Sequence, residues 1–381
     1  MNPPNGLEAL LLEWIAKRGP MPFAAYMQMA LYHPHHGYYA RDIPRTGWSG
    51  DFVTSAELDP AFGELWGRGF EQIWRACGSP DRFQVAEVGP GEGGFAEGVL
   101  NAVTGRFADA LDYCLVERNP HSQERQRARL GLRRGVWVDS IIELPHAGAG
   151  VAFANEVLDN LPVHLVEKRD GLLREVCVDA TNGELSLVLL PPSTPHLERF
   201  LERTGITLRE GHRMEVPLAV EVFVARLAST IDSGAVLLVD YGDEARDLAL
   251  RPEGSLVTYS ATGADDDPLA HPGEKDITAH VNWSAVRAAG AAAGLEMTGP
   301  RPQRELLLDL GLAELDAALR SHYQDDLAAG DGAGAVEALS RRQALAALAD
   351  GAGLGGAGVM GGWKAIGVLP WLRKPAALRP T

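Results

Sequence analysis

The sequence contains few cysteines, and this scarcity excludes two kinds of protein. Its 381 residues include 3 cysteines, Cys77, Cys114 and Cys177, which lie far apart and form no C-x-x-C pair. Such a pattern fits neither a disulfide framework nor a structural zinc site. The histidines of the segment 33–36 have no carboxylate partners at ligand spacing, so we predict no metal site.

Long hydrophobic runs are also missing. No uninterrupted apolar stretch approaches the roughly 18 residues of a transmembrane helix. The chain does not open with a basic segment followed by an apolar one, which is the pattern of a secretory leader. From these absences we predict a cytoplasmic protein that does not associate with membranes.

Positive charge is in short supply. The chain has 35 Lys and Arg against 51 Asp and Glu, a formal net charge of −16. A phosphate backbone would be repelled by such a surface, so we predict no nucleic-acid partner. A cationic acceptor, such as an arginine-bearing protein, is compatible with this charge.

Glycine, in contrast, occurs three times at alternate positions in one short segment that indicates a ligand-binding loop. The run Val85–Gly93 (V-A-E-V-G-P-G-E-G) reads as a buried strand followed by three glycines at alternate positions, and a helix follows near Phe95. Glycines allow a sharp turn and a close approach of the backbone to a ligand. The amides at the start of the helix are then expected to receive a polar or anionic group. This pattern indicates a loop that binds a nucleotide-like cofactor.

The spacing favours S-adenosyl-L-methionine over a dinucleotide. A dinucleotide site has the pattern G-x-G-x-x-G beside a pyrophosphate, whereas this loop reads E-x-G-x-G-x-G with Pro90 inside it. S-adenosyl-L-methionine carries an ammonium and a carboxylate instead of phosphates. We therefore predict that Glu87 holds the ammonium and that Gly89, Pro90, Gly91 and Gly93 border the cofactor. An ordinary strand-to-helix turn remains an alternative for the loop taken alone.

Polar residues also end the following predicted strands. Glu117 ends a strand at 111–117 and is placed to accept from the ribose hydroxyls; Asp139 and Ser140 follow a third strand, where Asp139 would accept from the adenine amine. Asn155 and Glu156 end a fourth strand at 151–156. Ligands bind outside the carboxyl ends of a parallel sheet. The series therefore predicts the α/β fold of a class I methyltransferase, with a Rossmann-like sheet.

The rest of the chain suggests additions to this core. Residues 1–80 are predicted to form a helical cap, with helices at 7–15, 22–31 and 60–77. Residues 165–231 are predicted to be an inserted subdomain, in which Arg169-Asp170-Gly171 and Thr181-Asn182-Gly183 signal antiparallel hairpins. The methyltransferase core then covers 81–164 and 232–369, with a fifth strand at 235–242, a helix at 281–293 and a last strand at 363–369.

With these motifs in place, the chain resembles the MidA family of methyltransferases. The resemblance rests on six blocks in order: Tyr32-His33-Pro34 with Gly37-Tyr38-Tyr39; Gly50 to Glu57 with Phe62-Gly63-Glu64; Glu87 to Gly93; Asn155 to His164 (N-E-V-L-D-N-L-P-V-H); Asp240-Tyr241-Gly242; and Pro272-Gly273 with Asp276 to Val281. The resemblance implies a seven-stranded sheet, S-adenosyl-L-methionine as donor and, as in the family's mitochondrial complex I assembly factors, methylation of a protein arginine.

The chain departs from the family pattern in two places. Ala56 stands where the family usually has proline, and the segment 255–267 is acidic where many members carry arginine and histidine. The second departure leaves the methyl acceptor open between an arginine-bearing protein, a peptide and a small molecule. A non-catalytic assembly factor that binds the cofactor, and a homodimer as the assembly, also stay open.

Methyl transfer requires alignment and desolvation of the acceptor nitrogen. Carboxylates would orient a guanidinium and help to remove its proton, so we predict Glu156, Asp159 and His280 as catalytic residues. A hydrogen-bonding role for Glu156 toward the 54–55 loop, and a helix cap for His280, are the alternatives. The remaining predicted contacts are Thr54 and Ser55 to the methionine carboxylate and Tyr38, Asp240 and Tyr241 to the acceptor.

Overall fold

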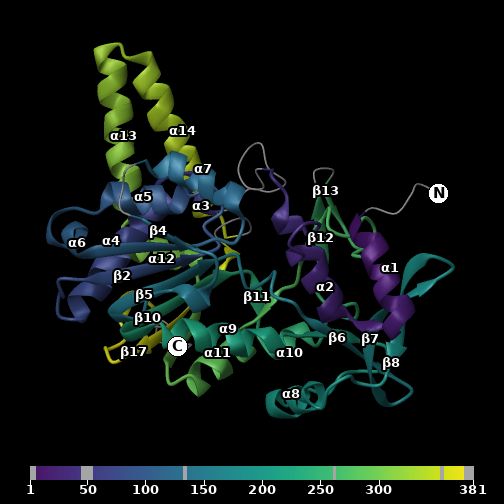
Figure 1. Ribbon diagram of the computed structural model, residues 1–381. Helices are drawn as coiled ribbons and strands as arrows, with labels where there is room; N and C mark the ends of the chain where they lie inside the picture. Colours follow the sequence, from purple (N-terminus) through teal and green to yellow (C-terminus); the bar gives the residue numbers. More distant parts are fainter. Residues whose placement is uncertain (1–5, 44–54, 132–134, 261–262, 352–355, 373–381) are drawn as a thin grey trace, which may run out of the picture. The chain divides into compact units, whose positions relative to one another are not determined.

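The computed structural model describes residues 6–43, 55–131, 135–260, 263–351 and 356–372 (Figure 1). These residues belong to two compact units. The first, here called the antiparallel unit, comprises residues up to 43 with 157–225 and 242–289; the second, the sheet unit, comprises 44–156, 226–241 and 290–381.

A seven-stranded sheet forms the centre of the sheet unit. Its strand order is β16-β17-β10-β5-β2-β3-β4. The strands are β2 (Phe83–Val88), β3 (Leu111–Val116), β4 (Val136–Val138), β5 (Ala147–Asn155), β10 (Ile231–Asp240), β16 (Glu296–Pro302) and β17 (Gly358–Lys364). The strands β4, β3, β2, β5 and β10 run parallel, whereas β17 is antiparallel to both of its neighbours. The carboxyl ends of five strands therefore meet at one edge, as the predicted class I methyltransferase fold requires.

An aromatic core fixes the helices α4 (Ala61–Ala76) and α5 (Gly94–Ala102) on one face of this sheet. Phe95 of α5 stacks on Phe153 of β5 with ring centroids 4.5 Å apart, and Trp66 of α4 meets Phe153 edge-on at 4.9 Å. Burial of such rings contributes several kcal/mol in total, at about 25 cal/mol per Å² of apolar surface. The glycine loop is thereby set on a rigid base.

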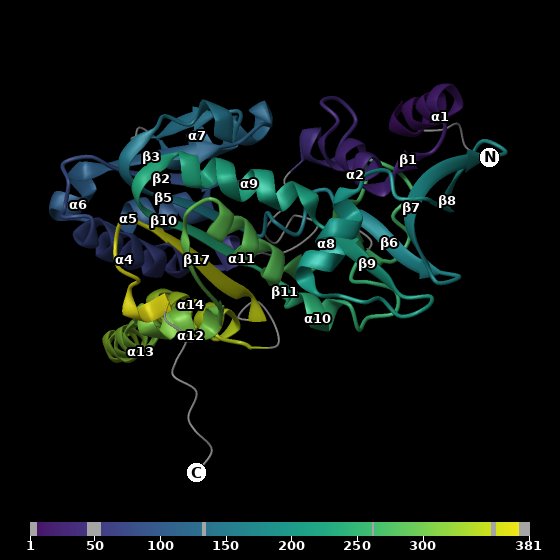
Figure 2. The same ribbon diagram turned by 90° about the horizontal axis from the view of Figure 1, so that it is seen from below.

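The sheet unit has further helices before, between and after its strands. They are α3 (Ser55–Leu58), α6 (Gly105–Ala110), α7 (Pro120–Leu130), α12 (Gln303–Asp309), α13 (Leu312–Ala329) and α14 (Gly332–Leu348), with short 3₁₀ turns η2 (Ile141–Glu143) and η4 (Pro370–Leu372). The helices α9 (Leu218–Ser229) and α11 (Trp283–Ala292) run from one unit into the other. Figure 1 shows α13 and α14 side by side as a hairpin that extends from the sheet, and Figure 2 shows the same hairpin nearly end-on.

The antiparallel unit is built around a second sheet. Its order is β1-β7-β6-β9, and β8 pairs with β7. The strands are β1 (Met21–Pro22), β6 (His164–Arg169), β7 (Leu172–Thr181), β8 (Glu184–Leu190) and β9 (Arg213–Val216). Asp170-Gly171 and Asn182-Gly183 have φ of 54°, 74°, 56° and 84°, the positive values that a type I′ hairpin turn needs. Both predicted hairpins are confirmed.

Short elements complete the antiparallel unit. Its helices are α1 (Gly6–Arg18), α2 (Phe23–Tyr32), α8 (His196–Thr204) and α10 (Ala245–Leu248), with a 3₁₀ turn η1 (Tyr38–Ala40). Its remaining strands are β11 (Gly242–Asp243), β12 (Val257–Ser260), β13 (Gly263–Asp265), β14 (Asp276–Thr278) and β15 (Val281–Asn282). None of the helices in the described ranges has the length and hydrophobicity needed to cross a membrane.

The prediction for the last strands of the sheet is wrong. β17 begins at Gly358 and ends at Lys364 instead of covering 363–369, and its partner β16 was not predicted. The glycines at 358, 361 and 362 indicate a loop in the sequence, yet they lie in the strand, where two of them leave no room for a side chain. A Cβ on Gly361 would lie 2.1 Å from Leu372, and one on Gly362 would lie 2.6 Å from Leu295. Close packing across the sheet outweighs the low strand propensity of glycine here.

Candidate functional site

The glycine loop joins β2 to α5 with a backbone that other residues would rarely adopt. Gly89, Gly91 and Gly93 have φ of 68°, 54° and 85°. Gly93 also lies against α7, because a Cβ there would stand 3.4 Å from Gln126. The loop therefore requires glycine for its conformation, and at Gly93 it lies in contact with α7.

The start of α5 is occupied by a carboxylate that the sequence did not reveal. Glu57 of α3 accepts from the Gly94 amide at 3.1 Å and pairs with Arg129 of α7 at 2.9 Å. The side chain of Glu57 is only 8% exposed. The anionic group that the sequence predicts at this helix start is therefore, at the Gly94 amide, a carboxylate of the chain itself. A carboxylate at the helix start also excludes a phosphate by charge and by occupancy, which favours a phosphate-free cofactor.

Glu87 lies within the sheet beneath the loop. It is 4% exposed, and its carboxylate accepts from the Tyr113 hydroxyl at 2.7 Å. Burial raises the pKa of Glu87 to about 8; the Tyr113 hydrogen bond opposes this rise and nearby Glu57 adds to it. At neutral pH the carboxyl group of Glu87 is mostly protonated. A cation placed beside it would stabilise the carboxylate and thereby promote loss of that proton.

Glu117 follows β3 and is held at both oxygens. Its Oε1 accepts from the Asn119 amide at 2.7 Å, and Gln126 Nε2 lies 3.5 Å from its Oε2. The same Nε2 donates to the Gly91 carbonyl at 2.8 Å. Gln126 thereby connects the ribose-binding candidate to the glycine loop.

Asp139 is linked to the same helix. Gln123, which is one turn before Gln126 on α7, donates to the Glu117 carbonyl at 2.6 Å and to Asp139 Oδ1 at 2.9 Å. Ser140 accepts from the Ile142 amide at 3.1 Å and so caps η2. Two glutamines at helical spacing after the second strand were the sequence signal for this arrangement, and it was missed.

The side-chain amide of Asn155, at the end of β5, has an acceptor oxygen without a partner among the described residues. Asn155 Nδ2 donates to Glu156 at 3.2 Å, while Asn155 Oδ1 is buried and has no hydrogen-bond partner within the part of the chain that the structure describes. A buried acceptor without a partner is costly. A ligand that donates a hydrogen bond at this point would relieve that cost.

Glu156 has a strained backbone and a perturbed carboxyl group. Its φ is 52°, a value rare for a residue with a side chain, and its amide donates to the Val239 carbonyl of β10 at 2.8 Å. Burial, and next to it the charge of Asp240, raise the pKa of Glu156 to about 7. Two carboxyl groups at the ends of neighbouring strands, one of them strained, are typical of a functional site.

The surroundings of Glu156 include the predicted loop contact. The Ser55 amide donates to Glu156 at 3.4 Å, and the buried Ser55 hydroxyl accepts from Gln303 of α12 at 3.1 Å. Asp240, which is fully buried, accepts from the Tyr241 amide at 2.8 Å. Thr54 lies outside the described residues. The catalytic and hydrogen-bonding hypotheses for Glu156 are thus compatible.

Three predicted residues belong to the antiparallel unit. Tyr38 is fully buried and packs edge-on against Tyr39. The Asp159 carbonyl accepts from the Ala279 amide at 2.9 Å. His280 lies 3.5 Å from Asp243, and burial lowers the pKa of His280, which keeps it neutral at pH 7. Asn282 caps α11, so the helix-cap alternative for His280 is wrong.

The sequence blocks of this unit meet in a buried polar network. Tyr39 donates to Asn160 at 3.0 Å and to Asp276 at 3.1 Å, and Asn160 donates to Asp276 at 2.9 Å. These residues come from three of the six blocks that carry the family resemblance. Part of the motif conservation expected from that resemblance therefore serves the structure of this unit.

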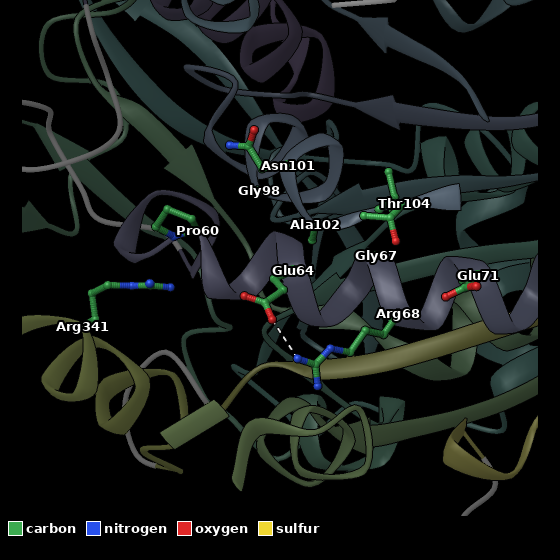
Figure 3. Close-up of a pocket in the computed structure, with 11 residues that line it drawn as sticks. Pro60, Glu64, Gly67, Arg68, Glu71, Gly98, Asn101, Ala102, Thr104 and Arg341 are labelled. Carbon is green, nitrogen blue, oxygen red and sulfur yellow. Dashed lines mark hydrogen bonds and ion pairs between the residues drawn. The ribbon is translucent and has the colours of Figure 1, made fainter. Parts of the chain in front are cut away.

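A separate polar cavity lies on the outer side of α4 and α5 (Figure 3). It has a volume of about 350 Å³. The Glu64–Arg68 ion pair on its wall spans 2.7 Å. Its lining residues are Pro60, Glu64, Gly67, Arg68, Glu71, Gly98, Asn101, Ala102, Val103, Thr104 and Arg341. The cavity contains none of the predicted site residues and meets the C-terminal end of α5, opposite the glycine loop.

The residues at the carboxyl edge fit S-adenosyl-L-methionine. The sheet unit brings together the predicted acceptors for ribose and adenine (Glu117, Asp139), the predicted acid for the ammonium (Glu87), a buried amide whose oxygen lacks a partner among the described residues (Asn155) and a helix start that already holds a carboxylate. No group of three or more His, Cys, Asp or Glu in the described ranges forms a metal site.

Comparisons with known proteins agree with this geometry. Residues 65–301 match a family described as S-adenosyl-L-methionine-dependent methyltransferases. The chain is 31% identical over 357 residues to the mitochondrial protein arginine methyltransferase NDUFAF7 homolog of Drosophila melanogaster, covering 81% of this chain and 78% of that protein. It is 30% identical over 348 residues to the human mitochondrial protein arginine methyltransferase NDUFAF7, covering 82% and 74%.

A solved structure shows the same fold with a ligand. A protein from Burkholderia thailandensis bound to S-adenosyl-homocysteine is 31% identical and superposes with a TM-score of 0.84, covering 95% of this chain and 92% of that one. The predicted cofactor and fold are therefore confirmed. The predicted cytoplasmic location is contradicted, because the curated relatives of this chain are named as mitochondrial proteins.

Proposed function

The chain belongs to the family of S-adenosyl-L-methionine-dependent methyltransferases, and on that premise we propose that it methylates an arginine side chain of a protein. The family membership and the buried pair of carboxyl groups at Glu156 and Asp240 carry this proposal. A guanidinium needs anionic partners at the reaction centre, and these groups supply them. The relatives named as protein arginine methyltransferases support the same acceptor.

At the donor end, the proposal gives each predicted residue one role. Glu87 binds the ammonium, Glu117 the ribose hydroxyls and Asp139 the adenine amine, while Asn155 uses its unpartnered Oδ1 to accept from the ligand. Gly89, Pro90, Gly91 and Gly93 border the cofactor, and Ser140 positions the turn after β4. Thr54 and Ser55 stay the predicted contacts of the methionine carboxylate. The bound cofactor supplies an electrophilic methyl group on its sulfonium.

At the acceptor end, Glu156 orients the guanidinium and accepts its proton. A carboxylate beside the attacking nitrogen fixes the orientation of the guanidinium, localises its positive charge on the distant nitrogen and accepts the proton that the methylated nitrogen loses as the methyl group leaves the sulfonium. A pKa near 7 suits proton acceptance at neutral pH. Asp240, which raises the proton affinity of Glu156, and Tyr241 complete the acceptor side. Asp159 and His280 stay predicted catalytic residues, and Tyr38 stays a predicted contact of the acceptor.

A small molecule or peptide is the less supported acceptor. The acidic segment 255–267 had favoured it, yet Asp265 is used internally: it accepts from Thr258 Oγ1 at 2.6 Å and pairs with Lys275 at 2.7 Å. These partners, Lys275 first, lower the pKa of Asp265 to about 2. Because Asp265 is bound to residues of its own segment, its charge is a weak argument for a small-molecule or peptide acceptor. A non-catalytic assembly role does not explain the strained Glu156.

The test is transfer of a labelled methyl group. The protein is incubated with labelled S-adenosyl-L-methionine and a mitochondrial extract, and the label is sought on proteins and on small molecules separately. We expect label on protein and a mass increase of arginine. Label confined to small molecules would refute the protein acceptor, and absence of label with intact S-adenosyl-homocysteine binding would favour the assembly role.

We also propose a homodimer. β8 pairs with β7 along one edge, and no strand of the described residues pairs with its other edge. Unpaired edges readily accept a further strand, and the segment Leu185–Leu190 carries no charge that a second copy would repel. Light scattering is expected to give twice the chain mass; a monomer at micromolar concentration would contradict this part.

A further inference from the structure

Gln126 lies where three parts of the donor site come together, and it is fully buried. Its Nε2 serves Gly91 and Glu117, as described above, while its Oε1 accepts from Trp137 Nε1 at 2.9 Å. An indole nitrogen can only donate. Trp137 therefore fixes the orientation of the Gln126 amide, so that its donor side always faces the loop and the carboxylate.

The side chain is held equally well by its neighbours. Gln126 packs against Gly93, and the Arg127 guanidinium lies over the Trp137 ring at 4.8 Å from its centroid. α7 itself starts from a side-chain cap at Asn119 with Pro120 in its first turn. Gln126 is thus held in place by α7 and Trp137, and its amide joins the glycine loop to Glu117.

We propose that Gln126 is a positioning residue for the ribose of the donor. By binding the Gly91 carbonyl and the Glu117 carboxylate with one amide group, it keeps the glycine loop and Glu117 at the separation that the adenosyl group requires. This inference rests on the proposed donor site. It adds a selectivity element that lies outside the contact residues: discrimination in favour of both ribose hydroxyls depends on Gln126.

Gln123 provides a matched comparison. It lies on the same helix, is 8% exposed, and uses its amide for the Glu117 carbonyl and for Asp139. If Gln126 positions Glu117 for the ribose, then by the same argument Gln123 positions Asp139 for the adenine amine. Replacing either residue by leucine removes a buried amide of similar volume, so general loss of packing would affect both variants alike.

The experiment measures binding by calorimetry with three ligands: S-adenosyl-homocysteine, its 3′-deoxy analogue and its inosyl analogue, which lacks the adenine amine. We expect Gln126→Leu to weaken S-adenosyl-homocysteine about tenfold or more and the 3′-deoxy analogue much less, so that ribose discrimination is lost. Gln123→Leu should keep ribose discrimination and reduce discrimination against the inosyl analogue. Combined with Glu117→Gln, Gln126→Leu should add little further loss.

Equal losses for all three ligands in Gln126→Leu would show a merely structural role and overturn the inference, as would unchanged affinities. A different result separates the inference from its premise: if the unmodified protein fails to bind S-adenosyl-homocysteine, the proposed donor site is wrong, and the inference with it. Thermal unfolding of both leucine variants verifies that they are folded during the measurement.

Discussion

Glu156 is the residue on which the proposed chemistry depends most directly. Its carboxyl group must be ionised to accept a proton, and burial and Asp240 raise its pKa to about 7. We expect kcat to rise with pH through about 7 in the unmodified protein. Glu156→Gln should lower kcat at least about 100-fold and leave donor affinity within about tenfold.

The pH profile of the variant discriminates between roles. In Glu156→Gln the residual kcat should no longer rise with pH near 7. Glu296→Gln, which alters an exposed glutamate of β16, serves as the control and should keep both rate and profile. Loss of donor binding together with turnover in Glu156→Gln would refute the assigned role.

Glu87 makes a separate prediction about cofactor binding. Burial raises its pKa to about 8, so the free protein carries a proton there at pH 7. An ammonium beside the group favours the carboxylate and lowers that pKa. Binding should therefore release a proton at pH 7, and affinity should rise with pH until about 8, by at most tenfold per unit.

Calorimetry in two buffers of different ionisation enthalpy counts the released proton. Glu87→Gln should abolish the release. Glu57→Gln, which removes a charge that raises the pKa of Glu87, should shift the pH dependence downward. If Glu87→Gln releases as many protons as the unmodified protein, the ammonium is bound elsewhere.

At the scale of elements, the crossing of α4 and α5 sets the base of the site. A Cβ on Gly63 would lie 2.5 Å from the Phe95 carbonyl, and one on Gly98 would lie 2.6 Å from the Pro60 carbonyl. Alanine normally favours a helix by about 1 kcal/mol over glycine. At this crossing we expect Gly63→Ala to destabilise the protein instead, by about 1–3 kcal/mol, through overpacking.

Denaturant unfolding tests this expectation. Gly332→Ala in α14, where a Cβ would meet nothing within 4 Å, is the control and should be neutral or slightly stabilising. A Gly63→Ala variant as stable as the Gly332→Ala variant would show that α4 and α5 pack less closely than described.

The elements also show what a sequence can and cannot predict. Strand ends such as Glu117 and Asn155 were predictable, because alternating strands and helices of a parallel sheet place them at one edge. Glu57 was not, because its role depends on Arg129, far away in sequence. Gln126 left only the signal of its spacing from Gln123, and its partner Gly91 is visible only in the folded chain. Gly361 and Gly362 were misread for the same reason: their neighbours Leu372 and Leu295 are visible only in the folded chain.

At the scale of the whole molecule, one sequence block connects the two units. The boundary between them falls after Glu156, so that Asn155 and Glu156 end a strand of the sheet unit while Asp159 and Asn160 belong to the antiparallel unit. Asn160 is held to Asp276 there. The motif thus joins the residue for which catalysis is proposed, Glu156, to a structural anchor at Asn160, and the letters of the motif alone do not distinguish the two.

A crystal structure of the protein with S-adenosyl-homocysteine tests the central claim most directly. We predict that the ligand lies at the carboxyl ends of β2, β3, β4 and β5. Its ribose hydroxyls should donate to Glu117, its adenine amine should donate to Asp139, and one of its donors should bind Asn155 Oδ1. A ligand found in the cavity between α4, α5 and α14, or bound without contact to Glu117 and Asn155, would contradict the account.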